Sequence, residues 1–101
     1  MQAHVLILFL DPSAHVEFLS SLLSRIDKEK SADAYVRLLS SIAQAKLLFG
    51  DLEGTRNDMD TALRLLDDMD GVEPSVNGAY YNVAADYYKV WDAFVLYVYV
   101  S

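Results

Sequence analysis

Three short stretches end a helical pattern with an aspartate, and they recur at nearly equal spacing along the chain. They are LFLD at 8–11, LFGD at 48–51 and KVWD at 89–92, so the aspartates lie 40 and 41 residues apart. An apolar segment with helical spacing follows each aspartate. A period near 40 residues with two helices per unit is typical of solenoids built from helical hairpins.

Apolar residues at helical spacing occupy five segments of the 101-residue chain, which are 2–10, 12–26, 35–49, 52–69 and 76–91. The stretch DGVEPS at 70–75 has the composition of a loop. The sequence therefore predicts an all-α fold in which antiparallel helical hairpins stack as a tetratricopeptide-like right-handed solenoid. We expect residues 1–101 to form a single helical-repeat domain.

Turns between the paired helices are predicted near residues 11, 50 and 91. Asp11 can cap the free amides of a helix, and Pro12 suits the first helical turn. A glycine inside a helix costs about 1 kcal/mol relative to alanine, so Gly50 is interpreted as a turn residue. Asp51 then stands at the N-cap of the next helix. By the same repeat, a third turn is expected near Trp91.

The composition argues against binding to nucleic acid. The net charge is −7, and the eight Lys and Arg residues are scattered rather than clustered. Such a chain repels a phosphate backbone. The apolar run Val5–Leu10 has six residues and no preceding Lys or Arg, which is too short for a signal segment or a membrane span. We expect a cytoplasmic and nuclear protein that does not enter a membrane.

No catalytic or cofactor-binding pattern occurs in the sequence. The chain has no cysteine and contains no phosphate-binding glycine loop, nucleophile elbow or Ser-His-Asp order. His4 and His15 lie on either side of the predicted Asp11 turn, but no further ligand completes a metal site. A metal-ligand role for them is the less favoured alternative. We predict no enzyme activity, no cofactor and no metal.

Aromatic residues gather in the last quarter of the chain. The pairs Tyr80-Tyr81 and Tyr87-Tyr88 are seven residues apart and therefore share a helix face. Stacking on RNA bases is one reading of them, but packing between helices is much commoner. The candidate interaction surface consists of Tyr80, Tyr81, Tyr87, Tyr88, Trp91 and Phe94.

The segment from Phe94 to Val100 is an uncharged run of Phe, Val, Leu and Tyr. Its β-branched and aromatic residues fit a strand at least as well as a helix. A window with high β-propensity, high hydrophobicity and no proline favours pairing between chains. We expect the isolated chain to self-associate, or to bind a partner, through this end.

Residues 41–90 resemble a known family. A helix ends in a small-Asp-Leu turn, and a long acidic helix, a GV loop and a helix with two tyrosine pairs follow. The matching residues are Leu48, Gly50, Asp51, Leu52, Gly71, Val72, Tyr81, Tyr87, Tyr88 and Lys89. This pattern is similar to the helical-repeat region of the family of proteasome non-ATPase regulatory subunit 13, the PCI-domain subunits of the regulatory-particle lid.

The resemblance implies a non-catalytic scaffold that packs beside other lid subunits of a complex that degrades ubiquitin-tagged proteins. It also implies that the chain is a fragment, because the winged-helix PCI module of the family is expected downstream. A generic helical-repeat adaptor that holds a peptide or a helix in a groove is the alternative. A small-molecule enzyme is the least favoured reading.

Overall fold

The computed structural model describes residues 12–100 of the chain. Its helices are α2 (Pro12–Leu23), α3 (Ala32–Leu48), α4 (Leu52–Asp67) and α5 (Pro74–Val100), and no strand occurs among these residues. The all-α prediction is therefore confirmed. The helix expected over 2–10 and the predicted cap Asp11 lie outside the described residues, although α2 does begin at Pro12.

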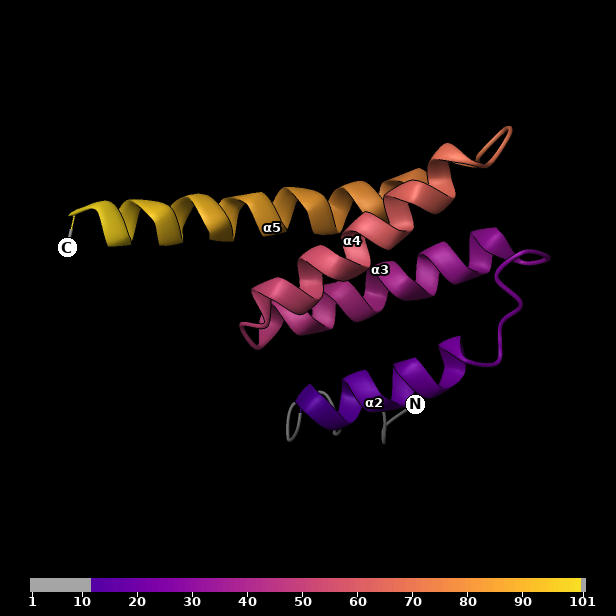
Figure 1. The fold of residues 1–101 in the computed structure, drawn as a ribbon, viewed down its shortest axis with the longest axis horizontal. Coiled ribbons are helices and arrows are strands. Elements are labelled where there is room, and N and C mark those ends of the chain that lie inside the picture. The colour runs from indigo at the N-terminus through magenta and orange to yellow at the C-terminus, as the bar shows by residue number, and fades with distance from the viewer. Residues whose placement is uncertain (1–11, 101) are drawn as a thin grey trace.

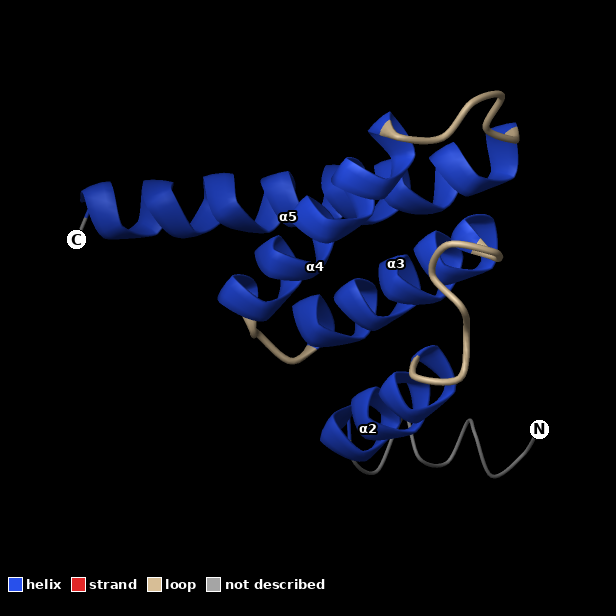
Figure 2. Cartoon of the chain, turned by 45° about the vertical axis from the view of Figure 1, so that its right-hand side comes forward, coloured by secondary structure: helices blue, strands red, loops and turns tan. Residues whose placement is uncertain are grey.

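Helix α3 is the centre of the fold (Figures 1 and 2). It contacts α2 on one side, α4 along the hairpin and α5 on the other side. Helix α5 also packs on α4, whereas α2 contacts no other described helix than α3. The C-terminal half of α5 projects beyond the helices on which its first half packs (Figure 1).

The turn between α3 and α4 forms where the sequence predicted one. Gly50 has φ +90°, a left-handed conformation that L side chains rarely adopt, and Asp51 N–H donates to the carbonyl of Lys46 at 2.9 Å. The Asp51 carboxylate accepts a hydrogen bond from the N–H of Gly54 at 2.9 Å. Asp51 is thus the N-cap of α4, and it satisfies one of the free amides of the first turn.

The core lies where α3, α4 and α5 meet. Its buried side chains are Val36, Leu39, Ala43, Leu47, Met59, Ala62, Leu66, Val76, Tyr80, Val83, Ala84 and Tyr87. Thr55 is fully buried beside the α3–α4 turn. Its hydroxyl lies 2.7 Å from the carbonyl oxygen of Asp51 and 3.3 Å from that of Ala43. A buried hydroxyl needs such acceptors, so Thr55 joins the start of α4 to α3.

A partly buried ion pair adds a second polar link between α3 and α4. Lys46 Nζ lies 2.8 Å from Asp58 Oδ2, and the two side chains are only 22% and 17% exposed. Among residues 12–100, no other group hydrogen-bonds to that oxygen. At the opposite end of the hairpin, Arg37 donates to Ser75 at 2.6 Å and to Glu73 at 3.2 Å, joining α3 to the start of α5.

The turn predicted near Trp91 is wrong. Helix α5 runs without a break from Pro74 to Val100. Trp91 stands where the middle repeat has Gly50, and no non-glycine residue among those described has a positive φ. A bulky residue cannot supply the left-handed conformation that ends α3, so the helix continues. The strand reading of Phe94–Val100 is wrong for the same stretch, which is helical.

Candidate interaction surface

The second half of α5 exposes an unusual amount of apolar surface. Every residue from Tyr88 to Val100 is exposed, and no charged residue follows Asp92. We call the exposed large apolar residues from residue 90 to residue 100 the tail patch, and they are Val90, Trp91, Phe94, Val95, Leu96, Tyr97, Val98, Tyr99 and Val100. Contiguous apolar patches of this kind mark interaction sites in folded proteins.

Within α5, one row of residues passes from the core into the tail patch. The spacing alternates between four and three residues along Val76, Tyr80, Val83, Tyr87, Val90, Phe94 and Tyr97. We call this row the α5 seam. Its first four members are buried against α3 and α4, and its last three are exposed. A 4–3 spacing keeps side chains on one face of a helix, so the face that builds the core continues uncovered.

The predicted surface residues divide between the interior and the exterior. Tyr80 and Tyr87 are buried in the core, so their prediction as surface residues is wrong. Tyr81 and Tyr88 are exposed and lie edge-to-face on their neighbours, with ring centroids 5.1 and 5.2 Å apart. Adjacent residues on a helix point about 100° apart, which is why each pair has one inner and one outer ring.

Trp91 and Phe94, the other two predicted surface residues, are exposed on the tail patch. Their rings stack with centroids 5.9 Å apart. Stacked aromatic rings bury large areas in protein interfaces at a low cost in conformational entropy. Their role in binding stays a prediction.

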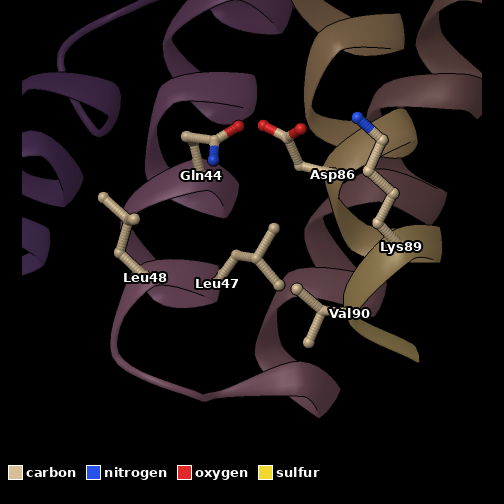
Figure 3. Close-up of a pocket in the computed structure, with 6 residues that line it drawn as sticks. All are labelled: Gln44, Leu47, Leu48, Asp86, Lys89 and Val90. Carbon is tan, nitrogen blue, oxygen red and sulfur yellow. The ribbon is translucent and has the colours of Figure 1, made fainter. Parts of the chain in front are cut away.

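A shallow groove lies where the covered half of α5 meets the uncovered half, and its volume is about 390 Å³. Figure 3 shows three α3 residues facing three α5 residues across it. The lining residues are Gln44, Leu47, Leu48, Asp86, Lys89 and Val90. The side chains of Gln44 and Asp86 point toward each other, and Leu47, Leu48 and Val90 form the apolar end.

Sequence reasoning missed this groove. The LFGD pattern predicts Leu48 at the end of a helix, and the structure places it at the end of α3 with its side chain strongly exposed. Val90 was not singled out at all. Val76, Val83 and Val90 are spaced seven residues apart, as the two tyrosine pairs are, and this spacing is the signal that could have identified Val90.

Two ionisable groups near the α4–α5 contact have perturbed pKa values. Hydrogen bonds from the Arg56 guanidinium to Tyr87 and to Asp60 raise the pKa of Arg56, which is already far above neutrality. Burial raises the pKa of the Tyr80 phenol, because the ionised phenolate is disfavoured away from water. Neither group titrates near neutral pH, so neither suits general acid–base catalysis there.

Residues 12–100 contain no group of three or more His, Cys, Asp or Glu side chains arranged to hold a metal ion. His15 is buried on α2, and His4 lies outside the described part of the chain. No helix in this part of the chain is long and apolar enough to cross a membrane.

The model of the PSD13 N-terminal repeats matches residues 1–101. The chain belongs to the PSD13 family. A curated relative agrees with PSD13 membership: the probable 26S proteasome regulatory subunit rpn9 of Schizosaccharomyces pombe is 39% identical over 71 residues. That alignment covers 70% of this chain and 19% of the relative, so the chain spans about a fifth of the yeast subunit. No solved structure gives a significant match to this PSD13 segment.

Proposed function

We propose that the chain is a non-catalytic structural part of the 26S proteasome regulatory particle, supporting the assembly that degrades ubiquitinated proteins. The observation that carries the proposal is the match of the whole chain to the PSD13 N-terminal repeats. The similarity to a regulatory subunit of the yeast proteasome supports it. The proposed residence is the cytoplasm and the nucleus.

The helical hairpin is the proposed structural unit of this role. In a stacked array, each hairpin buries its apolar stripe against the next one. Helix α5 packs on both members of the α3–α4 hairpin, as the first helix of a following repeat would. This supports a tetratricopeptide-like right-handed solenoid. In the same proposal, residues 1–101 form one repeat domain of a longer subunit with a downstream winged-helix PCI module.

The tail patch is the proposed contact with other lid subunits. It is apolar and uncharged beyond Asp92, and nothing in the described part of the chain covers it. Such a surface gains free energy when a neighbour covers it, at about 25 cal/mol per Å² of apolar area. When no neighbouring subunit is present, the same surface is proposed to bring copies of the isolated chain together.

Co-purification with the lid tests the proposal. A tagged chain expressed in cells should carry lid subunits with it, and Phe94→Asp should reduce their recovery. Leu63→Asp, which places the same charge on an exposed leucine of α4, is the matched control and should leave recovery unchanged. Absence of every lid subunit from the unmodified chain, with the chain folded by circular dichroism, would contradict the role and favour a generic helical-repeat adaptor.

A further inference from the structure

A second hollow lies between α3 and α5, beside the groove described above, and its volume is about 240 Å³. We call it the polar hollow, and its lining residues are Ser40, Ser41, Gln44, Ala79 and Asn82. Gln44 lines the groove as well, so the two depressions adjoin. None of the lining side chains is charged, and all except that of Ala79 carry a hydroxyl or a carboxamide. The polar hollow therefore offers hydrogen-bond donors and acceptors without a net charge.

The polar hollow lies within the packed part of the fold and not at its open end. Helices α3 and α5 run in the same direction there (Figure 1), and Arg37 of α3 donates to Ser75 of α5 at 2.6 Å one helical turn earlier. The lining residues come from α3 and α5, and none of them comes from α4. In the stacked array proposed above, the second helix of each hairpin lies on the α4 side, so a following hairpin would leave the polar hollow open.

Ser40 places an unused hydrogen-bonding group at the polar hollow. The residue is only 4% exposed, and its Oγ has no hydrogen-bond partner among residues 12–100. The neighbouring Ser41 differs, because its hydroxyl donates to the carbonyl of Arg37 at 3.2 Å. A buried hydroxyl without a partner costs free energy, and most such groups in folded proteins are paired. A rotation about the Cα–Cβ bond of Ser40 would let its hydroxyl pair with a polar group that enters the hollow.

We infer that the polar hollow binds the main chain of an extended, uncharged segment of a partner polypeptide. A carboxamide donates and accepts at the same time, as a peptide group does, so Gln44 and Asn82 are matched to main-chain N–H and C=O groups. A helical segment has no such free groups, because its own turns pair them. The net charge of −7 disfavours a nucleic acid, and none of the described residues that line the hollow is a cation that would hold a phosphate.

The length of the depression also favours a polypeptide. From Arg37 to Leu48, the wall formed by α3 is about 16 Å long, which is the length of about five residues of extended chain. Leu47 and Leu48 form part of the apolar end of the adjoining groove, about 10 Å along α3 from Ser40 and Ser41. An extended chain covers that distance in about three residues. A segment held at the polar hollow would thus place an apolar side chain, about three residues away, against the two leucines.

A short peptide tests this recognition in the isolated 101-residue chain, so the result does not depend on the lid proposal. The probe is acetyl-Ser-Ala-Ala-Ala-Leu-Ala-Ala-Ala-Ser-amide, which is too short to be helical and offers main-chain amides on both sides of the leucine. The control peptide carries N-methylalanine at every alanine position, so it lacks those N–H groups and keeps the same side chains. We expect the probe to bind with a dissociation constant of about 1 mM, and the control peptide to bind about tenfold or more weakly.

The side-chain amides of the chain report where the probe binds. The carboxamides belong to Gln2, Gln44, Asn57, Asn77 and Asn82. In nitrogen–proton correlation spectra, the NH₂ resonances of Gln44 and Asn82 should shift as the probe is titrated to millimolar concentration. Those of Asn57, which lies exposed on α4, should not shift. Shifts confined to Phe94–Val100 would mean that the leucine of the probe binds the tail patch, and they would overturn the proposal.

Two substitutions separate recognition from folding. Asn82→Ala should weaken binding of the probe about three- to tenfold, whereas Asn57→Ala on α4 is the matched control and should leave it unchanged. Ser40→Ala should also weaken binding, yet it should raise the melting temperature by about 2–6 °C, because it removes an unpaired buried hydroxyl. Opposite effects on binding and on stability are not expected of a residue that only packs.

Several outcomes contradict main-chain recognition at the polar hollow. The NH₂ resonances of Gln44 and Asn82 would then stay in place at millimolar probe, or the N-methylated peptide would bind as well as the probe. Equal losses of affinity in Asn82→Ala and Asn57→Ala would also overturn the proposal. A lower melting temperature for Ser40→Ala would show that its hydroxyl already stabilises the fold, and this would count equally against it.

Discussion

Val83 and Val90 lie seven residues apart on the same face of α5, but Val83 is 1% exposed and Val90 is 41% exposed. The sequence environment of the two valines is alike, since an aromatic residue follows each by four positions. The difference arises because α3 and α4 end before α5 does. Because α5 extends beyond α3 and α4, the first half of its apolar face is buried and the second half is exposed, although the apolar pattern is the same in both.

The two valines should therefore respond differently to truncation. Val83→Ala leaves a cavity in the core and should lower the free energy of unfolding by about 1–3 kcal/mol. Val90→Ala should lower it by less than about 0.5 kcal/mol when the protein is dilute enough to be monomeric. Urea unfolding of both variants at low micromolar concentration measures this. Equal losses would mean that α5 is covered along its whole length in solution.

Gly50→Val should destabilise the fold by about 1–3 kcal/mol, because a β-branched residue is strained at φ +90°. An added Cβ there meets no atom within 4 Å, so the cost comes from the backbone and not from a clash. Thermal unfolding followed by circular dichroism gives the change.

Gly78 is the control for Gly50. It lies inside α5 without a positive φ, and an added Cβ also meets open space there. Gly78→Ala should stabilise the protein by about 0.5–1 kcal/mol, since alanine is the better helix former. A melting temperature unchanged by Gly50→Val would show that the turn tolerates another conformation.

Removing Lys46 should be costly because it leaves the half-buried Asp58 carboxylate without its partner. We expect Lys46→Met to lower the free energy of unfolding by about 1–3 kcal/mol. The double variant with Asp58→Leu should recover part of that loss, since no charge is then left unpaired. A double-mutant cycle in urea measures the coupling. Strictly additive effects would place the pair among solvent-screened surface contacts.

The stability should fall in alkaline solution through Tyr80. Burial raises the pKa of Tyr80 above its ordinary value of 10.0, so the folded state holds this proton more tightly than the unfolded state does. The contribution is fully present below pH 10 and is lost as the pH rises through the folded pKa. Tyr80→Phe should reduce the fall in stability above pH 10, whereas Tyr81→Phe at the exposed neighbour should not. A pH series of urea midpoints for both variants distinguishes them.

The sequence predicted the interior better than the ends of the helices. The segments 35–49 and 52–69, in which apolar residues recur at helical spacing, contribute Leu39, Ile42, Met59, Ala62 and Leu66 to the buried interior. Phe49 is the last apolar residue of the segment 35–49 but is exposed, because the chain leaves α3 at the turn and carries the ring away from the core. Helical periodicity identifies the apolar face of a helix, but it does not show how far a neighbouring helix covers that face.

The candidate site was predicted in part for the same reason. Trp91 and Phe94 were identified by their aromatic character, but Tyr80 and Tyr87 were grouped with them although they belong to the core. Leu48 could not be assigned to the groove before α3 and α5 were seen side by side. A groove formed by two helices that are separated in sequence by all of α4 depends on tertiary packing, and a single sequence does not encode it in any local pattern.

Among the described helices, α2 contacts only α3, and this has a consequence for how the protein opens. Because α3 is the one described helix that α2 contacts, and a loop with an Asp27 side-chain turn joins the two helices, α2 can detach without separating α3, α4 and α5. The amide protons of α2 should then exchange with deuterium through a local opening of low free energy, whereas those of the α3–α5 core should exchange only through global unfolding. Within residues 12–100, α2 and the α3–α5 core would then open as two separate units.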